Sequence, residues 1–177
     1  MPLKMTAPES LDLSGINRHP YTIGLFIPGE LKEYVYEKQT SPFDKVSYPL
    51  GEQTALLFKK NLPSVFDDVK ELDSKDPAQD VVLILEPSIV KFSSVIPSPA
   101  YNPYTATMIY RIDVYDNAGE KIFTQTAIGE AQTSKGLLSG FVARSLASEV
   151  AQKAMENAVR QIIEGLSEAE ELKGYKQ

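Results

Sequence analysis

Runs of apolar and β-branched residues predict the strands of this protein. Residues 21–27 (YTIGLFI) lie between two prolines and have the length of one buried strand. Residues 81–85 (VVLIL) form the most apolar run, which is typical of a central strand covered on both faces, and Pro87 then predicts a bulge or bend. Residues 30–38 alternate and predict a strand that forms a hairpin with the first, with one helical turn as the alternative. A strand is also favoured over residues 65–70.

The clearest local signal is a hairpin that joins residues 108–114 to residues 122–128. Apolar and polar positions alternate along both stretches, and the intervening sequence DNAGE fits a type I turn followed by a glycine in the left-handed region. Such a turn places Val114 opposite Ile122, so the even-numbered side chains of both strands would share one apolar face.

Two segments have the spacing of amphipathic helices. Apolar residues recur every three or four positions over residues 51–62, and Pro63 then ends the pattern. Residues 140–166 carry charged side chains on one face and a stripe of small residues on the other, formed by Ala143, Ala147, Ala151, Ala154 and Ala158. The small side chains predict that this second helix packs closely against another element.

The order of these elements indicates the α+β class, with a single antiparallel sheet and the two main helices packed on one face. Residues 20–166 form the single domain in this interpretation. Residues 1–19 lack an apolar period and are expected to be a flexible N-terminal arm outside the core, and residues 167–177 are expected to be a C-terminal tail that frays.

Composition removes many classes of function. The 177 residues include 42% hydrophobic and 24% charged side chains, which is typical of a globular chain, and the net charge of −6 argues against a nucleic-acid partner. The chain has no cysteine and one histidine, so it offers neither a thiolate nucleophile nor a cysteine or polyhistidine metal site. We therefore expect no cofactor and no bound metal. No apolar run is long enough to span a membrane.

The side chains that carry catalysis in other proteins lack the necessary context here. His19 precedes Pro20 without a recognisable nucleophile motif, which favours a histidine at the surface or in a turn. Paired acids such as Asp67 with Asp68 and Asp113 with Asp116 lack the spacing of a calcium loop and are expected to be solvated. We therefore predict no catalytic residue, although a small hydrolase that uses carboxylates alone stays open as an alternative.

A binding loop is one interpretation of residues 93–105 (SSVIPSPAYNPYT). Prolines lower the entropy cost of ordering a loop, and tyrosines offer a broad contact area with a polar tip. These properties indicate Tyr101, Asn102 and Tyr104 as candidate binding residues. The alternative is a proline-stiffened crossover whose tyrosines cover the edge of the sheet, and exposure of Tyr101 and Tyr104 would favour the first interpretation.

Several of these segments together resemble a family of small envelope lipoproteins of Gram-negative bacteria. The segments are YTIGLFIPGELKEYVYE, the helix that begins at Gly51, the VVLILEP strand, the MIYRIDVYDNAGEKIFTQT hairpin and the alanine-rich helix, which together cover about residues 20–166. The similar groups are the YajG-like lipoproteins and, more loosely, the lipopolysaccharide-assembly lipoprotein of the outer membrane. The chain differs from this family in having no cysteine that could carry the lipid.

The resemblance implies a non-catalytic periplasmic domain that is tethered to the outer membrane and acts as a binding or assembly module in the cell envelope. It implies an envelope protein or a lipid-related molecule as the partner. Membrane association would then come only through a lipid anchor that this chain lacks. A cytoplasmic interaction domain is the alternative that composition leaves open.

Overall fold

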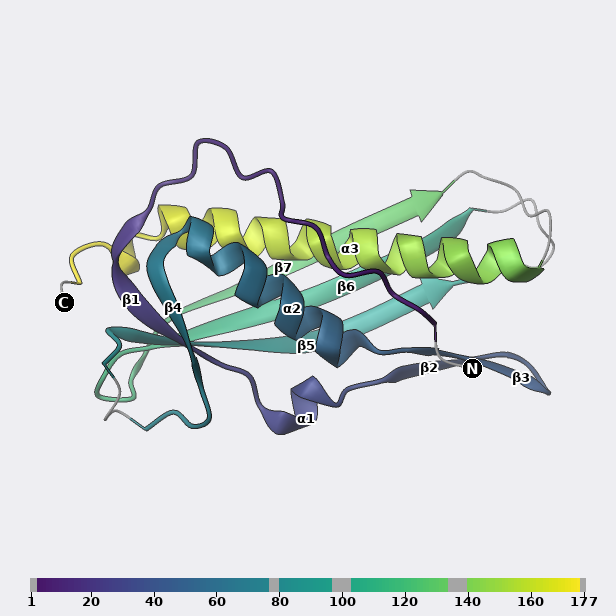
Figure 1. The fold of residues 1–177 in the computed structure, drawn as a ribbon, viewed down its shortest axis with the longest axis horizontal. Coiled ribbons are helices and arrows are strands. Elements are labelled where there is room, and N and C mark those ends of the chain that lie inside the picture. Colours follow the sequence, from purple (N-terminus) through teal and green to yellow (C-terminus); the bar gives the residue numbers. More distant parts are fainter. Residues whose placement is uncertain (1–2, 77–79, 97–102, 134–139, 176–177) are drawn as a thin grey trace.

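The computed structural model describes residues 3–76, 80–96, 103–133 and 140–175, which form a five-stranded sheet, a separate two-stranded ribbon and two main helices (Figure 1). The sheet has the strand order β4-β1-β5-β6-β7, and the ribbon consists of β2 and β3. In chain order the elements are β1 (His19–Phe26), α1 (Gly29–Lys32), β2 (Tyr36–Ser41), β3 (Asp44–Tyr48), α2 (Leu50–Asn61), the 3₁₀ turn η1 (Leu62–Ser64), β4 (Phe66–Leu72), β5 (Leu83–Val95), β6 (Tyr104–Tyr115), β7 (Lys121–Thr133), α3 (Gly140–Glu168) and the 3₁₀ turn η2 (Glu170–Leu172).

The α+β class is confirmed, but the prediction of a single antiparallel sheet is wrong. β5, β6 and β7 are antiparallel neighbours, whereas β1 lies parallel to both β4 and β5, and the ribbon forms a second sheet. The parallel pairing arises because the connection from β1 to β4 contains α2 and is long enough for a crossover. Strand β1 is buried on both faces, as expected for a strand inside such a sheet.

The predicted hairpin between the first two strands is also wrong, and the helical-turn alternative holds. The backbone N–H groups of Leu31 and Lys32 both donate to Pro28 O, each at 3.0 Å, and this short turn is α1. The alternating residues that follow pair with β3 instead of β1. Both main helices and the strand β4 lie where the sequence predicts them.

The β6–β7 hairpin forms with a register one residue different from the predicted one. Val114 lies opposite Phe123, and a bulge follows between Val114 and Tyr115. The buried even-numbered side chains of β6 therefore share a face with odd-numbered residues of β7, including Ala127 and Gly129. Ile128 lies on the other face and is 52% exposed.

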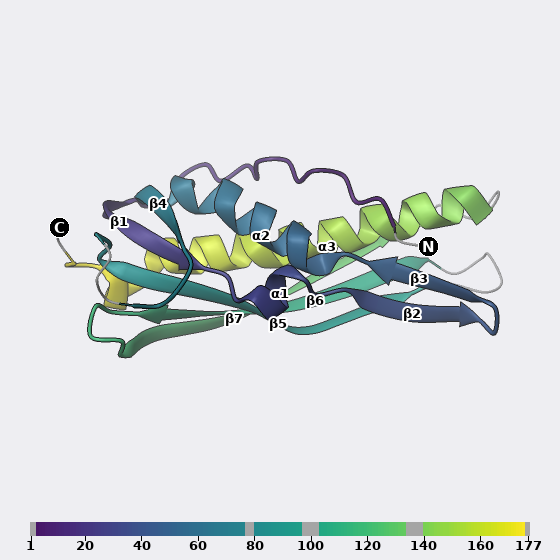
Figure 2. The same cartoon turned by 60° about the horizontal axis from the view of Figure 1, so that its bottom comes forward.

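Helix α3 covers the face of β6 and β7 that carries the small residues (Figure 2). Its alanines Ala151, Ala154 and Ala158 are buried there, as the stripe predicts. A Cβ atom at Gly129 would lie only 2.0 Å from Ala154 O, so the helix backbone approaches the strand directly. Helix α2 lies on the same face, where Thr54 Oγ1 and the Tyr110 hydroxyl are 2.7 Å apart.

Side chains of α3 also bind the outer edge of β7. Gln161 Nε2 donates to Ile128 O at 2.8 Å, and Asn157 Nδ2 donates to Glu130 O at 2.9 Å. These two carbonyl groups lie on the edge strand of the sheet and are therefore paired with the helix that covers the neighbouring face.

The two ends of the chain contribute to the core, which corrects the expectation of an arm and a tail outside it. Leu3 is buried and donates its N–H to Ser47 O at 2.8 Å, and residues 3–18 run along α2 and α3 (Figure 1). At the other end, Leu172 is buried and its carbonyl accepts a hydrogen bond from the Tyr21 hydroxyl at 2.8 Å. None of the described helices is long and apolar enough to cross a membrane.

Candidate functional site

The structure tests one of the three residues predicted for a binding loop. Tyr104 is the first residue of β6 and is only 1% exposed, so the expected exposure is wrong for it. Burial raises the pKa of its hydroxyl. Tyr101 and Asn102 lie outside the described residues. Tyr104 follows the alternation of β6, whose even-numbered side chains all turn toward the core, and for this residue the alternative of a structural tyrosine holds.

Tyr104 belongs to the contact between the β2–β3 ribbon and the end of the sheet. The rings of Tyr36 and Tyr48 pack against Phe92 of β5 with centroids 4.9 and 5.2 Å from it. Nearby, Lys38 Nζ donates to Ser94 O. The hydroxyl groups of Tyr48, Ser94 and Tyr104 are buried without a hydrogen-bond partner among the described residues. Burial raises the pKa of Tyr48.

The single histidine has a structural environment. His19 is buried at the start of β1, which corrects the expectation of a surface or turn histidine. Its ring stacks on Tyr21 and Phe66, and His19 Nε2 lies 2.9 Å from Leu166 O. Since a carbonyl oxygen only accepts, Nε2 carries the proton. The ring therefore fastens β1 to the end of α3.

Asp113 is buried and fully engaged, which corrects the expectation that this carboxylate is solvated. It accepts a hydrogen bond from Thr124 Oγ1 at 2.6 Å and pairs with Lys121 at 3.2 Å and Arg111 at 3.4 Å. Desolvation acts to raise the pKa of Asp113, but these donors and cations hold it below its usual range. Over the described ranges, no group of three or more His, Cys, Asp or Glu side chains is placed to hold a metal ion.

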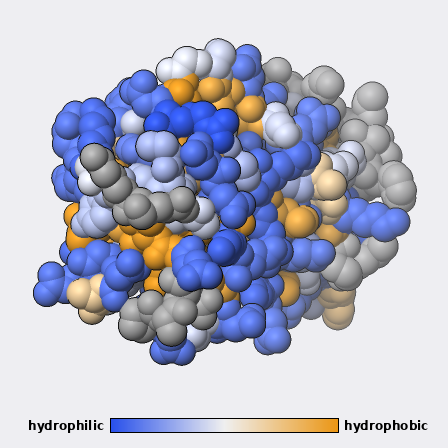
Figure 3. All heavy atoms as spheres, turned by 60° about the vertical axis from the view of Figure 1, so that its left-hand side comes forward, coloured by the Kyte–Doolittle hydropathy of each residue, from blue (hydrophilic) through white to orange (hydrophobic). Residues whose placement is uncertain are grey.

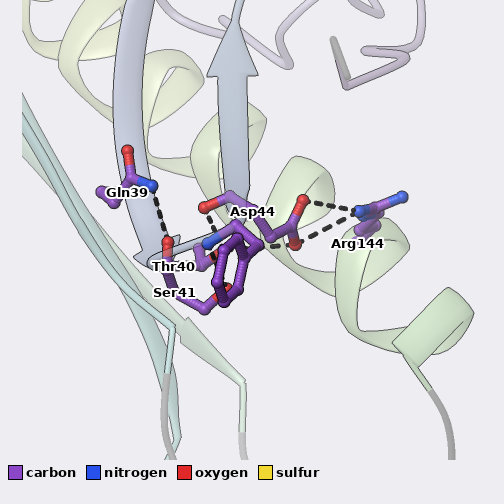
Figure 4. A network of polar contacts seen from close by, with 6 residues as sticks. Gln39, Thr40, Ser41, Asp44 and Arg144 are labelled. Carbon is purple, nitrogen blue, oxygen red and sulfur yellow. Dashed lines mark hydrogen bonds and ion pairs between the residues drawn. The ribbon is translucent and has the colours of Figure 1, made fainter.

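The tip of the β2–β3 ribbon carries the most exposed large apolar side chain of the described residues. Phe43 lies in the turn between the two strands and is 100% exposed. The turn itself is held by hydrogen bonds from Gln39 Nε2 to Ser41 O at 2.6 Å and from Thr40 Oγ1 to Asp44 Oδ2 at 3.2 Å (Figure 4). Phe43 N–H also donates to Ser41 Oγ at 3.3 Å. We refer to residues 41–44 as the ribbon tip.

An ion pair connects the ribbon tip to α3. Arg144 lies 3.2 Å from the carboxylate of Asp44, with its side chain directed toward the turn (Figure 4). Desolvation acts to raise the pKa of Asp44, but the Thr40 hydroxyl and the Arg144 guanidinium hold it below its usual value. On the neighbouring strands Lys45 pairs with Glu37. The charged groups beside Phe43 are therefore paired within the chain.

Arg144 also lines a groove between the N-terminal arm and α3. This groove has a volume of about 1060 Å³, and we call it the arm–α3 groove. Leu3, Thr6 and Ala7 line one wall, and residues spaced along one face of α3 line the other. Its charged lining residues are three basic and three acidic: Lys4, Arg144 and Lys153 with Glu9, Glu149 and Glu156.

The end of the molecule that carries the C-terminus has a different surface. Its apolar side chains form small areas that are separated by polar ones (Figure 3). Around this end, Lys75 pairs with Glu86 at 2.7 Å, and its ammonium group lies 4.6 Å from the centre of the Tyr115 ring. Polar and charged groups there contact each other, whereas the ribbon tip presents an uncovered aromatic ring.

Comparison with known proteins identifies a shared fold. No family model and no curated protein matches the chain. The solved structure of protein XCC0632 from Xanthomonas campestris, of family DUF330, is similar with a TM-score of 0.60, 9% identity and coverage of 94% of both chains. A minor lipoprotein from Acinetobacter baumannii is similar with a TM-score of 0.43 and 11% identity over 83% of this chain and 90% of that chain. The first likeness shows the same fold, and the second is too weak to do so.

Proposed function

We propose that this chain is a non-catalytic binding or assembly domain of the Gram-negative cell envelope, and that the ribbon tip with the arm–α3 groove is its partner-binding surface. The observation that carries the proposal is Phe43, which is fully exposed on a turn whose neighbouring side chains form hydrogen bonds within the ribbon. Leaving a whole aromatic ring in water is unfavourable, and a protein partner that buries the ring reverses this cost.

The geometry of the ribbon tip suits a protein partner. Aromatic side chains that enter a desolvated pocket supply much of the binding energy of protein interfaces. A turn that is already ordered loses little further conformational entropy when it binds. Asp44 and Lys45 already have intramolecular partners, so burying the tip does not leave an unpaired charge.

The titratable side chains support a role without catalysis. The His19 ring packs against two aromatic rings and is bonded to the backbone of α3, and Asp113 is surrounded by two cations and a hydroxyl group. Each of these contacts is made within the chain and stabilises the fold. A general acid or base needs an open position next to the atom whose proton it transfers.

The envelope location is supported by the resemblance of the strand and helix segments to YajG-like lipoproteins. In this proposal a lipid anchor joined to the domain tethers it to the periplasmic side of the outer membrane. Expression of the natural gene with its own upstream region, followed by fractionation and labelling with a radioactive fatty acid, tests this part. A product that is unlabelled and found in the cytoplasm contradicts it.

A photoreactive amino acid in place of Phe43 tests the binding surface inside cells. We expect a discrete protein adduct after irradiation from position 43. Position 70, where Lys70 is exposed on β4, serves as the control and should give none. Equal labelling from both positions, or none from position 43, contradicts a binding role for the ribbon tip.

A further inference from the structure

We propose that the partner of this surface is a second copy of the same chain, with the ribbon tip of each copy seated in the arm–α3 groove of the other. The inference rests on the proposed function, because it names the partner of the same surface. It predicts a closed dimer with two equal contacts.

The first reason is the position of the two parts. Arg144 lines the groove and also contacts Asp44 of the ribbon tip at 3.2 Å, so the projecting tip and the groove are neighbours on one surface. A two-fold dimer uses the same surface of both copies, so this surface must be complementary to itself. If one residue of the first copy contacts a second residue of the other copy, the same pair also forms with the two copies exchanged. A projection beside a groove meets this requirement.

The second reason is that the two contact surfaces have balanced charges, although the chain as a whole is negative. The chain carries a net charge of −6, and two copies therefore repel one another at long range. The charged residues that line the groove are three basic and three acidic, so the groove has no formal net charge. The charges next to Phe43 are paired within the ribbon or with Arg144. The contact surfaces are thus nearly neutral, and salt that screens the remaining repulsion should strengthen the dimer.

The third reason is the shape of the two parts. The groove of about 1060 Å³ is larger than a single side chain and has the volume that a turn of several residues would need. The ribbon tip offers such a turn, with Phe43 at its end and Pro42 beside it. Ala7, which is exposed, supplies an apolar contact in the groove wall for the ring.

Sedimentation velocity of the full chain over a range of concentrations tests the proposal, at low and at physiological salt. We expect the wild-type mass to rise with concentration and to level off at a dimer. Phe43→Ser removes the projection, and Ser145→Trp fills the groove at an exposed lining position. Each variant alone should dimerise at least about tenfold more weakly, since loss of an anchor residue typically has such an effect. Leu56→Ser, at a site that is 38% exposed on α2, is the matched control and should dimerise like the wild type.

Mixing the two variants gives the sharpest test. The Phe43→Ser chain keeps its groove and the Ser145→Trp chain keeps its ribbon tip, so a mixture restores one of the two contacts. We expect heterodimers that are weaker than the wild-type dimer and stronger than either variant alone. Circular dichroism and thermal unfolding show whether each variant is folded, and Ser145→Leu replaces Ser145→Trp if the latter is not.

Three results overturn the proposal. The wild type could stay monomeric at every concentration, the mixture could associate no better than its components, or mass could grow beyond a dimer into open chains. In each of these cases the photo-cross-link from position 43 separates the two proposals. An adduct with a different protein leaves the binding surface in place and excludes self-association, whereas no adduct at all removes both.

Discussion

The contact between α3 and the β6–β7 hairpin and the contact between the ribbon and the end of the sheet are built in different ways. In the first, alanines lie against Gly129 and the helix backbone approaches the strand directly. In the second, large aromatic rings pack together and three buried hydroxyl groups have no partner among the described residues. A buried polar group without a partner typically costs about 1–3 kcal/mol. The α3 contact contains one such atom among the described residues, Gln125 Oε1 on β7, against three at the ribbon, so we expect the ribbon contact to be the less stable of the two.

This difference separates two roles within one domain. The α3–hairpin region forms a packed body in which Gly129 has a steric reason, because the backbone of α3 lies directly against it. The ribbon holds an exposed aromatic residue in place with polar contacts that are individually weak. Substitutions in the two regions should accordingly affect different properties, stability in the body and association at the ribbon.

The largest effect is expected where α3 touches Gly129. The Cβ atom of Gly129→Ala would lie 2.0 Å from Ala154 O and 2.4 Å from Ala158 N, so the helix must move. We expect the free energy of unfolding to fall by about 3 kcal/mol, as overpacking of a rigid contact does. Urea unfolding measures it. In Gly29→Ala, the control, the added Cβ has no atom within 4 Å, and stability should be unchanged or slightly higher. Equal effects of both variants would show that the contact is not tight.

The next effect is expected at Asp113, which joins the hairpin strands. Asp113→Asn should lower the free energy of unfolding by about 2 kcal/mol at pH 7, because hydrogen bonds to a charged group are among the stronger ones. The pKa of Asp113 is lower in the folded chain than its unfolded value of about 3.9, so its contribution is complete above that value and is lost as the pH falls through the folded value. The wild-type and variant curves should therefore converge below about pH 4. Asp68→Asn, at an exposed position, is the control. If the free energies of unfolding of the wild type and Asp113→Asn differed by the same amount at every pH, the role given to the Asp113 carboxylate would be contradicted.

A pair of tyrosine variants compares the two regions directly. The Tyr110 hydroxyl bonds to Thr54 Oγ1 at 2.7 Å under α2, whereas the Tyr104 hydroxyl near the ribbon has no partner among the described residues. Tyr110→Phe should destabilise the protein by about 1 kcal/mol. Tyr104→Phe should be neutral or stabilising, since it removes a buried polar atom that makes no bond. Chemical unfolding of both variants in parallel measures the difference, and a clear loss from Tyr104→Phe would show that its hydroxyl has a partner after all.

The smallest effect on stability is expected at the ribbon tip. Phe43→Ser removes a side chain that contacts only water, so the free energy of unfolding should change by less than about 0.5 kcal/mol. Asp44→Asn breaks an exposed ion pair and should also have an effect below about 1 kcal/mol. Thermal unfolding measures both. A larger loss at Phe43 would mean that the ring supports the ribbon rather than a partner.

Local sequence pattern predicted the elements that depend on neighbouring residues. The helix of residues 140–166 has a continuous stripe of small residues, and the DNAGE turn has glycine at the position that requires a positive φ, which is 79° at Gly119. The register of the hairpin could not be predicted, because the bulge between Val114 and Tyr115 places the odd-numbered residues of β7 on the covered face, where Gly129 contacts α3. The alternation pattern contains no information about that contact.

Elements that depend on distant partners were harder to predict. Leu3 and Leu172 are isolated apolar residues in polar segments, and only the surfaces of other elements make them part of the core. Proline and tyrosine are typical of binding loops and therefore indicate Tyr101 and Tyr104 as candidates. Tyr104 instead continues the buried side of β6. Sequence pattern does not indicate Phe43, because one aromatic residue between Pro42 and Asp44 has no periodicity. A signal was present nevertheless, since a large apolar residue in a turn-forming sequence has no local reason to be buried.

The amide side chains that bind the edge of β7 also affect how the protein behaves when it is concentrated. An edge strand of 13 residues is long enough to recruit strands of other chains and to begin a fibril. Gln161 and Asn157 of α3 donate hydrogen bonds to the carbonyl groups of Ile128 and Glu130 on β7. Two of the acceptors that a strand from another chain would need are therefore already occupied. As long as α3 stays on the sheet, these two hydrogen bonds make pairing of another chain with β7 less favourable, and association between chains is favoured at other surfaces.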